Sequence, residues 1–183
     1  MPGDQPFDQI QESLKRVAAA LRDAEIPYLL GGGLAVWAQG GPPTGHDLDL
    51  MIKPEDAERA LQVLEDVGMR AERPPEGWLY KAWDGDVLVD LIFRPVGDPV
   101  DDAMFERANT VEVMAVPMLV MSLEDVMVTR LKTLDEHSLD FERPLEFARA
   151  LRERIDWRDV RKRTDGSPYA KAFFTLIEEL GIV

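Results

Sequence analysis

The spacing of apolar residues changes near residue 122, and this change divides the chain into two parts. Before it, short apolar runs typical of strands alternate with stretches whose apolar residues recur at helical spacing. After it, apolar residues recur at helical spacing alone. We therefore expect an α+β fold with a mixed β-sheet over residues 1–121, followed by an all-helical region over residues 122–183.

The individual elements follow from the same pattern, with prolines and glycines marking several of their ends. Helices are predicted in the first part at residues 8–25, 34–39 and 54–68. Strands are predicted at residues 26–30, 48–52, 79–83, 87–93, 111–116 and 118–121, with a hairpin turn at residues 84–86. The second part is expected to form helices at residues 123–135, 141–153, 156–163 and 168–180.

Composition narrows the function without identifying it. The chain has 183 residues, enough to bury a substantial core, and its lack of cysteine excludes disulfides, thiolate metal sites and cysteine nucleophiles. The net charge of −14 argues against general nucleic-acid binding, which needs a basic surface. Residues 143–163 depart from this balance, with eight Lys or Arg and four Asp or Glu. This basic segment could dock RNA or steer a phosphate-bearing substrate, or it could be a solvated helix face paired with local carboxylates.

Targeting features indicate a cytoplasmic protein. The first 23 residues lack the basic and then apolar layout of a secretory signal. No apolar run approaches the roughly 20 residues that cross a bilayer. We therefore expect a cytoplasmic location and no membrane contact.

The candidate chemistry lies in three aspartates that stand where strands would normally be apolar. Asp47 and Asp49 lie two residues apart at the start of a predicted strand, so their side chains share one face of the sheet. Asp90 interrupts the apolar run VLVDLIF, where an unpaired charge would be costly. Carboxylates this close repel unless a cation lies between them, and Mg²⁺ prefers oxygen ligands of this kind. A two-metal site is one interpretation, and a solvated strand edge is the other.

A glycine-rich turn precedes these aspartates. Gly32 and Gly33 follow a predicted strand and lead into a helix that starts at Leu34. Such a turn exposes backbone N–H groups and lets a phosphate chain approach closely. The alternative is an ordinary strand-to-helix turn.

The combination Gly32-Gly33-x13-Asp47-x-Asp49, with Asp90 downstream, resembles the signature of the nucleotidyltransferase superfamily related to DNA polymerase β. More narrowly, it resembles the small bacterial nucleotidyltransferases, which include abortive-infection toxins and antibiotic-modifying enzymes. The resemblance implies that the three aspartates bind two Mg²⁺ ions and carry catalysis, while the two glycines hold the triphosphate of an NTP such as ATP. It also implies transfer of an NMP group to a hydroxyl on a small molecule, a protein or an RNA 3′ end. A member of the toxin type would have a cognate antitoxin.

The resemblance also assigns nucleotide contacts outside the motif. Similar small transferases use a Lys on the first C-terminal helix, and an acidic residue shortly after it, to bind nucleotide. These roles fall here on Arg130, Lys132 and Asp140. Arg130 matches the position of that Lys better, and Lys132 matches its residue type. Arg130 and Lys132 lie about 200° apart around a helix, so both cannot face one pocket. His46 could contact a phosphate or the base, or it could be a surface loop histidine.

The chain departs from the family pattern just before Asp47. Many relatives carry R-x-T-x-D-x-D, whereas this chain has Pro43 and Gly45 at the positions of the Arg and the Thr. The missing Arg removes one phosphate contact. The alternative function is therefore a non-catalytic nucleotide-binding or protein-interaction module on the same fold, although such a module has no reason to keep three costly carboxylates.

Overall fold

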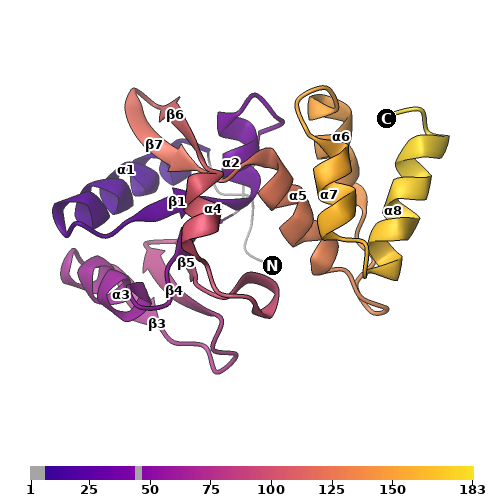
Figure 1. Ribbon diagram of the computed structural model, residues 1–183. Helices are drawn as coiled ribbons and strands as arrows, with labels where there is room; N and C mark the ends of the chain where they lie inside the picture. The colour runs from indigo at the N-terminus through magenta and orange to yellow at the C-terminus, as the bar shows by residue number, and fades with distance from the viewer. Residues whose placement is uncertain (1–6, 44–46) are drawn as a thin grey trace.

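A computed structural model of the protein describes residues 7–43 and 47–183 (Figure 1). The strands are β1 (Tyr28–Leu30), β2 (Leu48–Ile52), β3 (Arg70–Glu72), β4 (Leu79–Asp84), β5 (Val87–Ile92), β6 (Asn109–Val113) and β7 (Val116–Val120). The helices are α1 (Phe7–Asp23), α2 (Gly32–Ala38), α3 (Ala57–Asp66), α4 (Asp102–Glu106), α5 (Leu123–Lys132), α6 (Glu142–Leu151), α7 (Trp157–Arg163) and α8 (Pro168–Glu179). A short 3-10 turn, η1, covers Pro95–Gly97.

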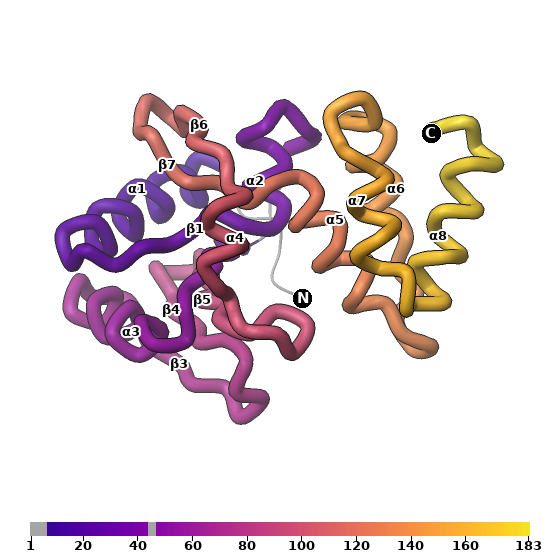
Figure 2. Tube along the Cα trace, in the orientation of Figure 1, coloured from indigo at the N-terminus to yellow at the C-terminus, as the bar shows by residue number. Residues whose placement is uncertain are grey.

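The strands form one mixed sheet in the order β3-β4-β5-β2-β1-β7-β6. Pairing is parallel between β2 and β5 and between β1 and β7, and antiparallel at the other junctions. Helices α1 and α3 pack together on one side of the molecule, and α5 to α8 gather on the other (Figures 1 and 2). This architecture confirms the predicted α+β class, with a mixed sheet followed by helices.

Helix α5 joins the sheet to the C-terminal helices. The last strand ends at Val120, and α5 begins at Leu123 and packs against α2 as well as α6, α7 and α8. Its apolar residues Val126 and Leu131 are buried in the core. Within the described part of the chain, no helix combines the length and the apolar content that crossing a bilayer requires.

The structure differs most from the predicted elements at residues 109–120. A hairpin of β6 and β7 turns at Met114 and Ala115, which have positive φ angles of 51° and 63°. Two-residue turns of this kind normally contain Gly or Asn. This turn contains neither, so its position could not be predicted from residue type. Pro117 is tolerated inside β7 because it faces Glu112 at a position where its nitrogen points away from β6. Strand β3 and helix α4 were not predicted either, and at three and five residues they are too short to show a period.

A buried carboxylate ties α5 to two other parts of the chain. The side chain of Asp125 is 0% exposed. Arg107, which follows α4, donates to both of its oxygens, with Nε to Oδ2 and Nη2 to Oδ1 both at 3.0 Å. Arg163 at the end of α7 also donates to Oδ1. Burial alone would raise the pKa of Asp125, but the hydrogen bonds and charges of the two guanidinium groups together lower it below its ordinary value.

We expect Asp125→Asn to lower the free energy of unfolding by about 2–3 kcal/mol, because two charged hydrogen-bond donors lose their anionic acceptor. The cost stays below that of a fully buried pair because both arginines are partly in water. Urea unfolding of the wild type and the variant measures it. Asp23→Asn is the matched control, since Asp23 and its partner Arg22 are both exposed, and its stability should equal that of the wild type. Equal stability of all three proteins would contradict a structural role for Asp125.

Candidate active site

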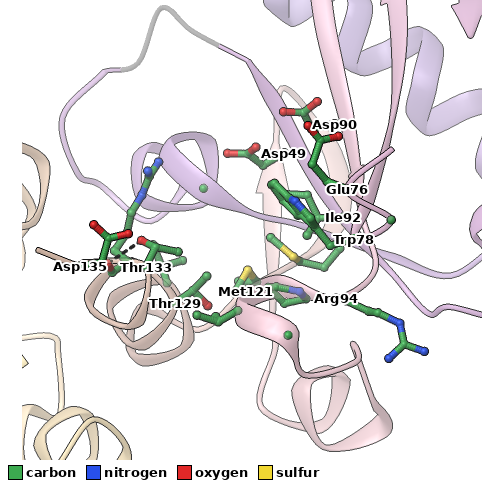
Figure 3. A pocket seen from close by; sticks show the side chains of 18 residues that line it. Asp49, Glu76, Trp78, Asp90, Ile92, Arg94, Met121, Thr129, Thr133 and Asp135 are labelled. Carbon is green, nitrogen blue, oxygen red and sulfur yellow. Dashed lines mark hydrogen bonds between the residues drawn. The ribbon is translucent and has the colours of Figure 1, made fainter. Parts of the chain in front are cut away.

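Two of the predicted aspartates lie side by side in the sheet. Strands β2 and β5 pair in parallel, and their register places Asp49 directly opposite Asp90. Leu48 and Leu50, the neighbours of Asp49, are fully buried, so strand alternation turns Asp49 to the face away from them. Figure 3 shows both carboxyl groups at the edge of one pocket. Asp47 precedes β2 and lines an adjoining cavity together with both of them.

The glycine turn packs directly against Asp49. Gly32 has a φ of +54°, and a Cβ atom added there would lie 1.7 Å from Asp49 Oδ2. A side chain at this position would displace the Asp49 carboxyl group or the turn, and the backbone conformation also favours glycine. One residue earlier, the N–H of Gly31 donates to the carbonyl oxygen of Asp49 (2.8 Å). The glycines and the aspartate therefore form one structural unit.

Two cavities meet at the Asp49–Asp90 pair. The larger has a volume of about 840 Å³ and the smaller about 420 Å³, and Arg130 on α5 lines both. Their other walls differ in chemistry. The larger cavity exposes mainly apolar surface, from side chains that include Met51, Trp78, Ile92, Met121 and Val126, and its wall also contains Glu76, Arg94 and Asp135. The smaller cavity is lined mainly by glycine and charged residues, with one aromatic ring: Gly33, Pro43, Asp47, Arg143 and Phe147.

Burial and crowding shift the pKa values of both paired carboxyl groups. Burial, and then the negative charge of Asp90, raise the pKa of Asp49 from its ordinary 3.8 to about 7, although Arg130 acts in the opposite direction. Burial also raises the pKa of Asp90. This shift persists although Lys81 Nζ lies 3.0 Å from Asp90 Oδ1 and favours the charged form. The positive charge near Asp49 and Asp90 is therefore too small to keep both carboxyl groups ionised at their ordinary pKa values.

The raised pKa of Asp49 predicts a pH-dependent loss of stability in the cation-free protein. Folded Asp49 keeps its proton up to about pH 7, whereas the unfolded chain releases it near 3.8. Because the folded state binds more protons across this window, the free energy of unfolding should fall as the pH rises through it. We expect Asp49→Asn to lack this component. Urea unfolding with a chelator present, on both sides of the window, measures it, and an equal fall in both proteins would contradict this pKa.

The donor set of the site fits a hard divalent cation. Asp47, Asp49 and Asp90 offer carboxylate oxygens around one cavity, and the raised pKa values mark a local need for positive charge. Across residues 7–43 and 47–183, however, no three Asp, Glu or His side chains are already gathered closely enough to hold a metal ion. Asp90 contacts Lys81 instead. Binding a cation would therefore require the three carboxyl groups to draw closer together.

The fold and this arrangement of glycines and aspartates match a known family. A family model described as "Uncharacterised nucleotidyltransferase" matches residues 8–178. The chain belongs to this nucleotidyltransferase family. The match spans both the sheet and the C-terminal helices, and it confirms the superfamily and the enzyme class that the sequence motif indicated. A comparison of this nucleotidyltransferase with curated proteins finds no match.

Several solved structures share the fold of this nucleotidyltransferase. ANT(2'')-Ia in complex with adenylyl-2''-tobramycin has a TM-score of 0.67 and 15% identity, covering 90% of this chain and 99% of that one. The lincosamide antibiotic adenylyltransferase LnuA, bound to lincomycin, has a TM-score of 0.55 and 12% identity, covering 84% and 97%. A putative nucleotidyltransferase from Thermotoga maritima has a TM-score of 0.56 and 18% identity, covering 71% and 88%. At these identities the likeness establishes the fold.

Of the described residues outside the motif that were predicted to contact nucleotide, only Arg130 lies at the carboxyl pair. Arg130 lines both cavities at the carboxyl pair. Lys132 lies elsewhere on α5, where its Nζ is 3.9 Å from Asp98 and where it lines a separate cavity of about 300 Å³. Asp140 is exposed and accepts a hydrogen bond from the backbone N–H two residues later (2.9 Å), at the start of α6. His46 lies outside the described residues.

Three residues that line or contact this candidate site were not among the site residues predicted from the sequence. Lys81 contacts Asp90, Trp78 lines the larger cavity, and Arg143 lines the smaller one. Lys81 could have been found only from the register of the β4–β5 hairpin, because the register decides which residue of β4 faces Asp90. No local pattern distinguishes Trp78 or Arg143 from a packing tryptophan or a surface arginine.

Proposed function

We propose that this nucleotidyltransferase moves an NMP group from an NTP to a hydroxyl group of a small molecule, in a reaction that depends on Mg²⁺. One observation carries the proposal: the Asp49–Asp90 pair lies where a small charged cavity meets a larger, mainly apolar one. A transferase of this kind must bring a polyphosphate and an acceptor together at the same atoms. Two chemically different cavities that share the same carboxyl groups meet this need.

The triphosphate is assigned to the smaller cavity. Arg130 lines it and brings positive charge toward phosphate oxygens. Arg143 lines it as well and also pairs with Glu146. Gly33 also lines this cavity, and a residue without a side chain lets a polyphosphate approach the backbone closely. Arg130 partly replaces the phosphate contact that the family's usual arginine makes before the first aspartate.

The acceptor is assigned to the larger cavity. Its volume of about 840 Å³ falls within the range of small-molecule sites, roughly 300–1,000 Å³. Met51, Trp78 and Met121 offer it apolar contact area, and Thr129 offers a hydroxyl. A protein or RNA acceptor would need a broader contact surface. Two structures of the same fold, ANT(2'')-Ia with adenylyl-2''-tobramycin and lincomycin-bound LnuA, contain small molecules.

The proposed reaction is a single displacement at phosphorus. Asp47, Asp49 and Asp90 would hold Mg²⁺, in two positions when nucleotide is bound, and the bound cation supplies charge neutralisation at the phosphates. Asp90 lines both cavities and is therefore placed to accept the proton of the acceptor hydroxyl. The acceptor oxygen forms a bond to the α-phosphorus as the bond from that phosphorus to the bridging oxygen breaks. Pyrophosphate leaves with that electron pair.

The basic segment at residues 143–163 is largely engaged within the protein. Arg163 pairs with Asp125 and Asp159, and Arg161 pairs with Glu178. Arg154 donates to the carbonyl oxygen of Gln39. These contacts favour the solvated and locally paired helix face over an RNA-docking surface. An RNA contact and a cognate antitoxin stay predictions from the sequence.

The proposal is tested by following the α-phosphate. The purified protein is incubated with α-labelled ATP, GTP, CTP or UTP and Mg²⁺, together with the small-molecule, protein or RNA fraction of a cell extract. We expect label to enter the small-molecule fraction, with one pyrophosphate released for each label transferred, and Asp47→Asn to abolish both. Label in the protein or RNA fraction would contradict the acceptor class. Absence of transfer, with nucleotide binding that ignores Mg²⁺, would instead support the non-catalytic module.

A further inference from the structure

An apolar floor continues from the carboxyl pair along the same two strands. Met51 follows Asp49 by two residues on β2, and Ile92 follows Asp90 by two residues on β5. The parallel register pairs Met51 with Ile92, just as it pairs Asp49 with Asp90. Residues two apart on a strand share one face of the sheet, so Met51 and Ile92 form a row beside the carboxyl pair, and both line the larger cavity.

A second methionine adjoins the apolar floor of Met51 and Ile92. A Cβ atom added at Gly31 would lie 2.8 Å from Met51 Cε and 3.2 Å from Met121 Sδ, so both methionines pack against the glycine turn. Both also line the larger cavity. Thioether groups make favourable contacts with aromatic rings. This part of the cavity therefore suits an aromatic ring better than a polar group.

Trp78 stands at the end of the apolar floor (Figure 3). Its backbone is held there, because its carbonyl oxygen accepts hydrogen bonds from the N–H groups of Phe93 (3.0 Å) and Arg94 (3.1 Å), which follow Ile92. Trp78 is nevertheless 42% exposed, and among the described residues that line the larger cavity it is the only aromatic one. An uncovered indole on a fixed backbone offers a preorganised flat surface to a second ring.

Val96 adds another exposed apolar side chain to the same cavity. It lies in η1 with a φ of 55°, a conformation that is strained for a β-branched residue. The turn is closed by a hydrogen bond from the N–H of Gly97 to the carbonyl oxygen of Arg94 (3.2 Å). Strain of this kind persists where the surroundings impose it, and it is typical of ligand sites. Trp78 and Val96 are thus two apolar side chains held open toward one cavity.

The charged side chains of the cavity disfavour an acidic ligand. Away from the carboxyl pair and Arg130, the wall contains the carboxylates of Glu76 and Asp135 and the guanidinium of Arg94. A carboxylate or phosphate group on the acceptor would therefore meet more negative than positive charge there.

The distance between the apolar floor and the carboxyl pair limits the length of the acceptor. Two residues along a strand span about 7 Å, so the Met51–Ile92 row lies about that far from the Asp49–Asp90 row. An acceptor with its ring on the floor reaches the carboxyl pair only when its hydroxyl oxygen lies about 7 Å from the ring centre. A phenol or a benzyl alcohol is too short, whereas a chain of three carbon atoms is sufficient.

We propose that the acceptor is an alcohol that has an aromatic ring and no acidic group. The ring packs on the apolar floor against Trp78, and the hydroxyl lies at Asp90. Trp78 is then a specificity-determining residue, because it selects the ring and takes no part in the chemistry. The inference rests on the proposed function, since it names the class of acceptor for the proposed reaction.

The first experiment compares two alcohols of equal chain length, 3-phenylpropanol and 3-cyclohexylpropanol, in NMR titrations with Mg²⁺ and a nonhydrolysable NTP analogue present. The saturated ring is the more hydrophobic, so a cavity that is merely apolar would prefer it. We expect the wild type to bind the aromatic alcohol about fivefold more tightly, Trp78→Phe to keep this preference and Trp78→Leu to lose it. The affinity for the NTP analogue should be the same in all three proteins.

Trp83→Leu is the matched control. Trp83 donates from Nε1 to Glu72 (3.2 Å), and the Arg70 guanidinium lies over its ring, outside the two cavities. This variant should keep the preference of the wild type for the aromatic alcohol. Thermal unfolding of each variant shows that it is folded.

The second experiment follows transfer of label from an α-labelled NTP. We expect 3-phenylpropanol to acquire label and benzyl alcohol, whose hydroxyl is two carbon atoms closer to the ring, to acquire none. Three results would overturn the inference: equal binding of the two rings or no binding of either, equal labelling of the two aromatic alcohols or of neither, and a loss of NTP-analogue affinity in Trp78→Leu, which would place the nucleobase on Trp78.

The cell-extract experiment separates the inference from the proposed function. Label on a small molecule of the extract, together with any of those three results, would leave the proposed function standing without an aromatic acceptor. Preferential binding of 3-phenylpropanol without label on any acceptor would overturn the proposed function, and with it the assignment of the ring to an acceptor.

Discussion

Replacing Asp90 with asparagine is expected to lower kcat for nucleotidyl transfer by about 10³-fold while leaving the protein folded. The amide occupies nearly the same volume, but it neither accepts a proton from the acceptor nor binds a divalent cation as a carboxylate does. Asp90 lines both cavities and is 12% exposed, so it is placed to act on both substrates. Initial rates of pyrophosphate release, measured with the acceptor that the labelling experiment identifies, give the effect.

Asp84→Asn is the matched control for this substitution. Asp84 ends β4, is 14% exposed, accepts a hydrogen bond from Ser13 and pairs with Arg16. Asp84 is therefore about as buried as Asp90 and also pairs with a basic side chain, but it lies outside the two cavities. We expect the control to lose stability comparably and to keep its activity. A loss of less than about tenfold for Asp90→Asn, or equal losses for both variants, would contradict the catalytic role of Asp90.

Gly32→Ala is expected to lower kcat/KM by about 10²-fold or more, because it moves the Asp49 carboxyl group. The new Cβ atom would lie 1.7 Å from Asp49 Oδ2, so either the carboxyl group or the glycine turn must shift. The positive φ of Gly32 adds a backbone cost of about 1–2 kcal/mol for any other residue. The overlap adds about 1–3 kcal/mol more to the loss of stability. Steady-state kinetics and urea unfolding of the same preparation measure both effects.

Gly85→Ala separates the backbone cost of a positive φ from the effect of the overlap with Asp49. Gly85 has a similar φ of +62°, and no described atom lies within 4 Å of the Cβ that alanine would add. This variant should therefore show the backbone cost alone, with activity close to that of the wild type. Comparable activity losses for the two variants would show that the space beside Asp49 is not what requires glycine at position 32.

The long periodic elements and the motif residues were predictable from the sequence. Predicted helices at 8–25, 141–153 and 168–180 correspond to α1, α6 and α8 within a few residues, because each has a clear apolar stripe. The prediction that Asp49 and Asp90 lie on neighbouring strands agrees with the register of β2 and β5. Asp47 precedes β2 and lines a cavity together with both. Strand alternation predicts which way Asp49 points, because its two flanking leucines face the core, but it does not show that β5 lies beside β2.

The surroundings of the aspartates depend on register and tertiary packing, which the sequence does not reveal. A hairpin turn at residues 84–86 would pair Asp90 with Tyr80, whereas the observed register pairs it with Lys81. A one-residue change of register moves every side chain of β4 to the opposite face, so Lys81 could not be assigned to the site. Likewise, helical geometry shows that Arg130 and Lys132 diverge, but only the packing of α5 decides which one faces the cavities.

Calorimetry tests whether the three aspartates bind a nucleotide through divalent cations. A nonhydrolysable NTP analogue is titrated into the wild type and into Asp47→Asn, each with Mg²⁺ and with a chelator. We expect the wild type to bind the analogue with Mg²⁺, and to lose most of its affinity when either the cation or the Asp47 carboxylate is removed. Binding of equal strength under all four conditions would contradict it.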